Sequence, residues 1–193
     1  MEKFTGIILA GGKSSRMQQD KALLKFREKF FFEILYDRLK DFCTKVIIST
    51  NNPEVKINAV NCVSVPDIIK NAGPGGGIYS ALDASETEKN LIVSVDTPFV
   101  PKELFDFLIK ANRQDFVVTV ISEGETLHPL IGIYSKKFTD ILFSELNSGN
   151  KKIRDIIRKV PYNIADIKKE SFYNGLILKN INTQAEYNAI LKL

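Results

Sequence analysis

A glycine-rich segment near the amino terminus carries residue types that bind phosphate groups. Gly11 and Gly12 follow the apolar run 5–9 after one intervening residue, Ala10, and the basic side chains Arg16 and Lys21 come next. Glycines after a buried strand let backbone N–H groups approach a polyphosphate closely, and nearby basic residues add positive charge. The segment matches neither the GxGxxG nor the GxxxxGK[ST] fingerprint. A triphosphate site is therefore one interpretation, and a plain strand-to-helix turn is the alternative.

A carboxylate stands at the end of the most apolar strand candidate. Asp96 follows residues 91–95 and precedes Thr97 and Pro98, which favour a turn. Such a carboxylate is costly to bury unless it is paired or binds a metal ion. Proteins usually hold Mg²⁺ by one or two carboxylates together with substrate phosphates. Asp96 is thus a candidate Mg²⁺ ligand, with a turn or helix-capping residue as the alternative.

Two further features are candidates for ligand binding. The glycine cluster 73–77 could bring a helix amino terminus close to a ligand, because glycine is kept where nothing larger fits. A flexible surface loop is the alternative for that cluster. His128, the only histidine, could bind a phosphate or a ring system, or could be a hydrogen-bonded residue at a strand edge.

Polar residues in the second half of the chain are weaker candidates. Asn180 and Asn182 alternate in an extended segment and could hydrogen-bond a polar ligand, or one of them could cap the last helix. Lys152 and Arg154 belong to a basic cluster that could meet an anionic second substrate. The alternative for the cluster is a solvated helix face.

Alternating apolar runs and amphipathic stretches predict the elements that position these residues. The predicted strands cover 5–9, 45–50, 62–65, 91–95, 116–121, 130–134 and 176–179. The predicted helices cover 30–42, 78–85, 102–111, 138–146 and 153–159, and a last one begins near Thr183, which has capping-box spacing to Glu186. This alternation, with continuously apolar strands, predicts an α/β fold: a three-layer α/β/α sandwich with a Rossmann-like, mainly parallel sheet, forming a single domain over 1–193. Ligands of such sheets bind beyond the carboxyl ends of the strands.

Composition narrows the possible functions. The chain has 193 residues, of which 44% are hydrophobic and 26% charged, as in ordinary globular proteins. Its net charge of +4 comes from interleaved basic and acidic residues, which argues against a nucleic-acid binder. Cys43, expected in a helical stretch, and Cys62, expected to open a strand, are not in a CxxC pair, so a zinc site is not expected. The apolar run 7–10 is too short for a signal peptide or membrane span, so we expect a cytoplasmic protein with no membrane partner.

Taken together, the motifs resemble one known family. They are Leu9-Ala10-Gly11-Gly12, Arg16-Met17, Asp20-Lys21-Ala22-Leu23-Leu24, Asp67, Gly73-Pro74 with Gly77, Asp96-Thr97-Pro98-Phe99, His128-Pro129-Leu130 and Asn180-Ile181-Asn182-Thr183. The first three resemble the signature of nucleotidyltransferases that share a Rossmann-like glycosyltransferase-A fold. The complete set, spread over nearly the whole chain, is most similar to the molybdenum cofactor guanylyltransferases.

The resemblance implies a reaction and a role for each motif. GTP and molybdenum-bearing molybdopterin would give the guanine dinucleotide cofactor and pyrophosphate, with Mg²⁺ as the metal ion. By this resemblance, GTP would be held by the first loop, at Leu9, Ala10, Gly11 and Gly12. Asp67 would contact the nucleoside, with Asn51 nearby. Arg16 and Lys21 would neutralise the triphosphate, and Asp96 would be the metal ligand there. His128, Asn180 and Asn182 would lie towards the pterin, with Lys152 and Arg154 as weaker candidates. Delivery proteins and recipient molybdoenzymes would be partners.

One residue departs from the family pattern. Gln18 stands where the family usually has a glycine, so the geometry of the loop could differ. The alternatives are a molybdopterin cytidylyltransferase, a sugar-phosphate nucleotidyltransferase and a non-catalytic nucleotide-binding protein of the same fold. Retention of both Lys21 and Asp96 argues against the non-catalytic alternative.

Overall fold

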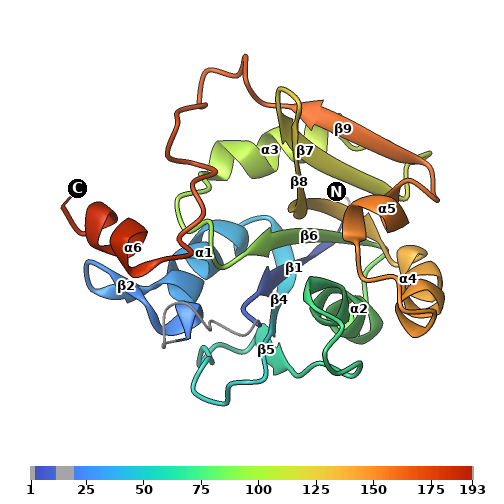
Figure 1. Ribbon diagram of the computed structural model, residues 1–193, viewed down its shortest axis with the longest axis horizontal. Helices are drawn as coiled ribbons and strands as arrows, with labels where there is room; N and C mark the ends of the chain where they lie inside the picture. Colours follow the sequence, from blue (N-terminus) through green and yellow to red (C-terminus); the bar gives the residue numbers. More distant parts are fainter. Residues whose placement is uncertain (1–2, 12–19, 193) are drawn as a thin grey trace.

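Seven strands form one sheet in the computed structural model, which describes residues 3–11 and 20–192 (Figure 1). The strand order is β5-β4-β1-β6-β8-β7-β9. The strands are β1 (Phe4–Leu9), β4 (Cys43–Ser49), β5 (Cys62–Val65), β6 (Lys89–Ser94), β7 (Val118–Glu123), β8 (Thr126–Ser135) and β9 (Tyr162–Asp166). Strands β5, β4, β1 and β6 are parallel, β8 is antiparallel to both neighbours, and β9 is parallel to β7. The predicted mainly parallel sheet is confirmed.

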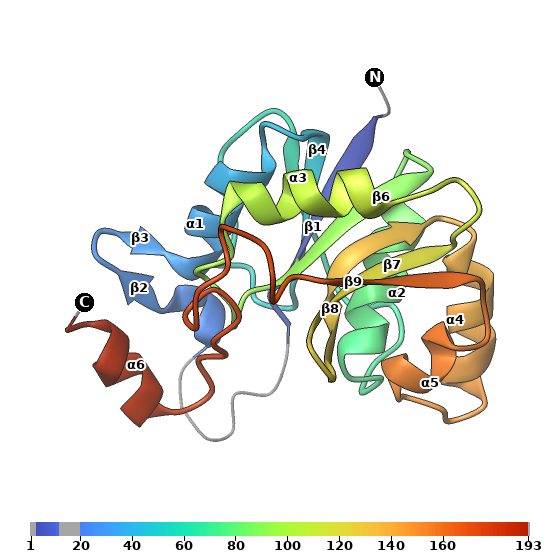
Figure 2. The same ribbon diagram turned by 90° about the horizontal axis from the view of Figure 1, so that it is seen from above.

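Helices cover both faces of the sheet, with α1 and α3 on one face and α2, α4 and α5 on the other (Figures 1 and 2). Their bounds are α1 (Phe31–Leu39), α2 (Pro74–Ala84), α3 (Lys102–Ala111), α4 (Phe138–Asn147), α5 (Ile153–Ile157) and α6 (Gln184–Ile190). A short 3-10 helix η1 (Lys21–Leu23) precedes a hairpin of β2 (Lys25–Phe26) and β3 (Lys29–Phe30). Two separate apolar cores result, one on each face, which confirms the predicted three-layer sandwich.

The central strands are apolar on both sides because both of their faces are covered. Every residue of β1 is buried, and Ile7 lies between Ile47 of β4 and Ile92 of β6. Gly132 shows how closely the neighbouring strands approach, because a Cβ there would lie 2.3 Å from the backbone oxygen of Thr119. A larger residue at this position would force the backbone apart.

Helix α2 begins four residues earlier than the sequence predicts. Gly73 precedes it with a φ of 62°, and Pro74 occupies the first helical position, where proline is favoured. The following glycines have low helix propensity, which hid the first turn from sequence-based prediction. They are required by packing, since a Cβ on Gly76 would lie 2.8 Å from the backbone oxygen of Ile69.

Two sequence-based assignments are wrong, and three strands were not predicted: the short β2 and β3, and β9 of the main sheet. Residues 176–179 form turns and not a strand, although Ile177 and Leu178 are buried in the core. Cys43, expected in a helix, is the first residue of β4, and burial raises the pKa of its thiol to about 12. Strand β9 was missed because it lies at the edge of the sheet and exposes Tyr162 and Ile164.

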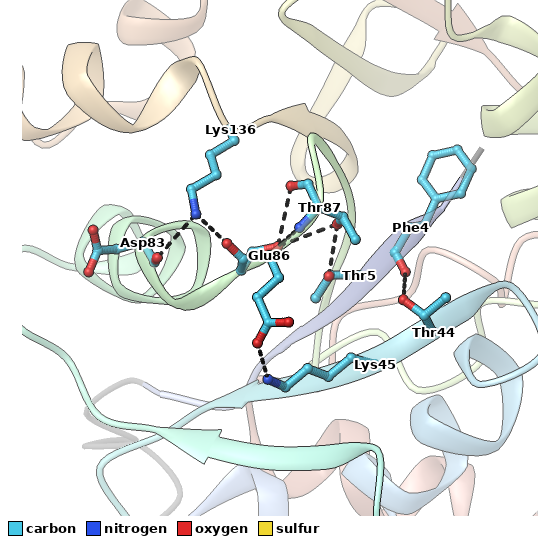
Figure 3. A network of polar contacts seen from close by, with 9 residues as sticks. Phe4, Thr5, Thr44, Lys45, Asp83, Glu86, Thr87 and Lys136 are labelled. Carbon is cyan, nitrogen blue, oxygen red and sulfur yellow. Dashed lines mark hydrogen bonds and ion pairs between the residues drawn. The ribbon is translucent and has the colours of Figure 1, made fainter.

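A polar network fixes the amino ends of the central strands (Figure 3). Thr87 donates its hydroxyl to the hydroxyl of Thr5 on β1 at 2.8 Å, and Lys45 on β4 pairs with Glu86 at 3.0 Å. These contacts tie the α2–β6 connection to β1 and β4. They hold the end of the sheet opposite to the cavity described below.

Among the described helices, none combines the length and apolar character needed to cross a membrane.

Candidate active site

A cavity of about 1070 Å³ opens at the carboxyl ends of β1, β4 and β6. This is the edge at which parallel sheets bind ligands. It is lined by the last residues of three strands, Leu9 of β1, Ser49 of β4 and Ser94 of β6, and by the start of α2. Residues that follow the strands complete the lining: Ala10 and Gly11 after β1, residues 50–53 after β4, Asp67 after β5 and Asp96 after β6. Six of the residues predicted to bind nucleotide therefore line one space: Leu9, Ala10, Gly11, Asn51, Asp67 and Asp96.

One end of the cavity presents an acceptor without a hydrogen-bond donor. Asn51 Nδ2 donates to Asp67 Oδ2 at 3.0 Å, and the backbone N–H of Asp67 donates back to Asn51 Oδ1 at 3.1 Å. Asp67 Oδ1 and the hydroxyl of Ser49 are both buried and have no partner among the described residues. A Cβ on Gly77 would lie 2.7 Å from Ser49 Oγ and 3.6 Å from Asp67 Oδ1, so glycine keeps this corner open. Buried polar atoms without partners are rare and point to a bound group.

The second predicted cluster, Lys21 with Asp96, also forms. Lys21 Nζ lies 4.0 Å from Asp96 Oδ2, and both side chains are about one-fifth exposed. Lys21 Nζ donates to Asn182 Oδ1, so a residue 161 positions away completes the cluster. The backbone N–H of Ile181 donates to the backbone oxygen of Asp96 at 2.8 Å. A cation thus lies 4.0 Å from a carboxylate that lines the cavity.

Lys21 is held in place from its amino-terminal side as well. Asp20 caps η1, because its Oδ1 accepts the backbone N–H of Ala22 at 3.0 Å. Its second oxygen accepts from Asn52 Nδ2 at 2.9 Å, which links η1 to the segment after β4. Neither Asp20 nor Asn52 was predicted to be a site residue, although Asp20 begins the motif Asp20–Leu24. The available signal was their position, since each is adjacent to a predicted site residue, Lys21 and Asn51.

His128 lies on β8 beside the cavity-lining residue Leu130, in a polar setting of its own. Its Nε2 is buried without a hydrogen-bond partner among the described residues and lies 3.9 Å from Glu123 Oε2. Tyr173 donates its hydroxyl to the other oxygen of Glu123. Burial lowers the pKa of His128, with Glu123 opposing this shift and Arg154 adding to it. The imidazole is therefore neutral at pH 7.

The remaining candidates stand outside the cavity lining. Lys152 and Arg154 are exposed, and Arg154 Nη2 donates to the backbone oxygen of Leu127 at 2.7 Å. Asn180 is exposed, in contrast to Asn182. Gly12 and Arg16, together with Gln18, lie outside the described residues.

Comparisons with known proteins match this chain to the same family over most of its length. The family model of the MobA-like NTP transferase domain matches residues 6–164. A protein of Flavobacterium johnsoniae, named "Probable molybdenum cofactor guanylyltransferase", is 38% identical over 188 residues, or 97% of this chain and 96% of that protein. A protein of Clostridium perfringens with the same name is 36% identical, covering 100% of this chain and 98% of its own length. The crystal structure of molybdopterin-guanine dinucleotide biosynthesis protein A from Archaeoglobus fulgidus superposes with a TM-score of 0.79 at 18% identity, covering 97% of each chain.

Proposed function

Because this chain belongs to the MobA-like NTP transferase family, we propose that it transfers GMP from GTP to molybdenum-bearing molybdopterin. An oxygen of the terminal phosphate of the pterin bonds to the α-phosphorus of GTP. The bond from that phosphorus to the β-phosphate oxygen breaks, and pyrophosphate leaves with the electron pair. Such a reaction depends on positioning and charge neutralisation more than on covalent help from the protein.

The observation that carries the proposal is the arrangement of the cavity. Its volume of about 1070 Å³ is just above the usual range for small-molecule sites, about 300–1,000 Å³. It is lined by Asp67, whose Oδ1 has no partner among the described residues, and by Asp96, which lies 4.0 Å from Lys21. A nucleoside bound at Asp67 and a triphosphate bound at Asp96 and Lys21 would together span the carboxyl edge of the sheet, with the backbone of Gly11 between them.

The chemistry of Asp67 supports guanine as the base. Guanine presents N1–H and N2–H₂ as adjacent donors on one edge, whereas cytosine presents only its N4–H₂ donor on the corresponding edge. Asp67 Oδ1 is an acceptor and has no donor among the described residues. The second oxygen, Asp67 Oδ2, accepts once from Asn51 and keeps a further lone pair. The paired donors of guanine can therefore bond to both carboxylate oxygens, whereas the one amino group of cytosine can satisfy Oδ1 but adds no second adjacent donor.

The donor set also fits Mg²⁺. Asp96 offers carboxylate oxygens at the cavity edge, and residues 3–11 and 20–192 hold no group of three or more His, Cys, Asp or Glu side chains suited to a metal ion. Mg²⁺ is commonly held by one or two carboxylates plus phosphate oxygens, so Asp96 would share it with the triphosphate. When bound, the ion supplies charge neutralisation at the phosphates. Lys21 adds positive charge from the protein side.

The test is pyrophosphate release with molybdopterin, Mg²⁺ and each of the four nucleoside triphosphates. We expect kcat/KM for GTP to exceed that for CTP by at least about tenfold, the value of one well-made hydrogen bond. Preference for CTP would make the protein a cytidylyltransferase. Tight binding of Mg-GTP without pyrophosphate release from any acceptor would support the non-catalytic alternative.

We predict that Asp67→Asn raises KM for GTP about tenfold and leaves kcat nearly unchanged, because a charged acceptor of the nucleoside is lost while the reacting phosphates are untouched. Steady-state kinetics with pyrophosphate detection measures both constants. Glu54→Gln, an exposed carboxylate of the loop after β4, is the matched control. Equal KM values for GTP in Asp67→Asn and the unaltered protein would remove Asp67 from the nucleoside site.

We also propose that the protein acts in the cytoplasm, receives its pterin from a delivery protein and passes the product to a molybdoenzyme. Nucleic acid and membrane have no part in the proposed reaction.

A further inference from the structure

The carboxyl-terminal segment 179–190 reaches the site from outside the family-matched residues 6–164. It runs back from β9 across the molecule, and α6 ends beside β2 (Figure 2). The phenol of Tyr187 makes hydrogen bonds of 3.3 Å and 2.8 Å with the backbone N–H and oxygen of Lys25. Ile181, fully buried, anchors the segment in the core. Ile181 and Tyr187 therefore attach the segment before and after Asn182, the residue that accepts a hydrogen bond from Lys21.

Glu186 determines the local shape of this segment. Its Oε2 accepts the backbone N–H groups of Asn182 and Thr183, each at 2.8 Å, and the Thr183 hydroxyl lies 3.0 Å away. Thr183 Oγ1 accepts the backbone N–H of Glu186 in return, at 3.2 Å. A capping box needs only the bond to the N-cap residue. The additional bond to Asn182 fixes the residue whose side chain meets Lys21.

The charge on Glu186 strengthens these bonds. The backbone N–H of Asn182 is the largest cause that lowers the pKa of this carboxyl, and Thr183 lowers it further. Glu186 is thus ionised at neutral pH, and hydrogen bonds to an ionised acceptor are roughly twice as strong as neutral ones. The acceptor at Asn182 Oδ1 is consequently held on a well-fixed backbone.

We propose that Glu186 is a positioning residue for nucleotidyl transfer: by fixing Asn182 it holds the ammonium group of Lys21 beside Asp96. A lysine side chain loses rotamer entropy when it is fixed in one geometry. Holding it in advance removes that cost from the step in which the triphosphate is engaged. Glu186 touches neither substrate and acts through Asn182 and Lys21. The inference rests on the proposed function.

The first test compares three variants of α6 at a temperature where circular dichroism shows each one folded. We expect Glu186→Ala to lower kcat/KM for GTP about tenfold, since a misplaced catalytic group commonly costs that much or more. Glu186→Gln keeps an oxygen acceptor and is expected to regain most of the activity. Gln184→Ala, which removes an exposed hydrogen bond to Asn188 on the same helix, is expected to keep full activity.

The second test separates positioning from simple helix capping. In a Lys21→Ala background, Glu186→Ala is expected to change kcat/KM by less than about twofold, because the group it positions is absent. Multiplicative losses in the double variant, or an equal loss in Gln184→Ala, would overturn the inference. Glu186→Asp takes the place of Glu186→Ala if the latter does not fold, since the shorter carboxylate cannot reach all three donors.

Failure of the proposed function gives a different result. An unaltered protein that releases no pyrophosphate with any nucleoside triphosphate would contradict the function itself. The positioning role would then be tested by measuring GTP affinity by calorimetry in the three α6 variants, in Lys21→Ala and in the double variant. A Glu186→Ala loss of affinity that disappears in the Lys21→Ala background supports positioning, and its persistence there refutes it.

Discussion

Asp96→Asn is expected to abolish turnover, with a loss of roughly 10³-fold in kcat, while the protein remains folded. The substitution keeps the shape of the side chain but removes the negative charge that holds the metal ion. Metal-ion stabilisation of phosphoryl charge contributes several kcal/mol, and each 1.4 kcal/mol is about tenfold in rate. The fold does not depend on this carboxylate, because the backbone oxygen of Asp96, and not its side chain, accepts the N–H of Ile181.

Pyrophosphate release and thermal unfolding measure the two parts of this prediction. Asp106→Asn, an exposed carboxylate on α3, is the control for the loss of one negative charge. A calorimetric titration adds a more direct measurement, since Mg²⁺ should strengthen GTP binding in the control and not in Asp96→Asn. Full activity of Asp96→Asn with Mg²⁺ would remove Asp96 as the metal ligand.

The sequence predicts several strands and helices of the sandwich well, because the residue patterns that indicate them are local. Strand β5 has the predicted bounds Cys62–Val65, and α3 has the predicted bounds Lys102–Ala111. The predicted capping box of Thr183 and Glu186 is confirmed by reciprocal hydrogen bonds. In each case a short run of residues carries the whole pattern, so tertiary contacts are not needed to recognise it.

Predictions failed where distant contacts replace local preference. Ile177 and Leu178 are adjacent apolar residues, which favour a strand, but they enter the core from a turn. Strand β9 pairs with β7 on one side only, and its exposed edge weakens the apolar pattern. The glycines that begin α2 oppose helix formation locally and are kept because a Cβ would meet a part of the chain outside the helix: the side chain of Leu146 at Gly75, the backbone of Ile69 at Gly76 and the Ser49 hydroxyl at Gly77.

The functional site likewise contains some residues that local sequence patterns predict and others that only distant contacts bring together. Polar residues that follow strand ends could be recognised from the sequence, because parallel strands bring their carboxyl ends to one edge. That rule places Asn51, Asp67 and Asp96 at the cavity. No sequence rule pairs Lys21 with Asn182 across 161 positions, so the positioning role of Glu186 emerges only from the folded chain.

Lys21→Ala is expected to lower kcat/KM for GTP by roughly 10²–10³-fold, the cost of removing one fixed donor aimed at transition-state charge. The reason is electrostatic, since the ammonium group lies 4.0 Å from the cavity-lining Asp96, the proposed site of the triphosphate, whose negative charge increases on the leaving pyrophosphate. Stability should change little, because Lys21 is only partly buried and its ion pair with Asp96 spans 4.0 Å. Lys25→Ala, an exposed lysine on β2, is the control for the loss of one positive charge.

Nucleotides of different phosphate length separate a phosphate role of Lys21 from a structural one. If Lys21 neutralises the β- and γ-phosphates, Lys21→Ala weakens the binding of GTP far more than that of GMP, which lacks both groups. If Lys21 merely holds Asn182 and the carboxyl-terminal segment in place, both nucleotides lose affinity equally. An unchanged kcat/KM for GTP would contradict both roles and leave Arg16, from the same glycine-rich segment, as the remaining basic candidate for the triphosphate.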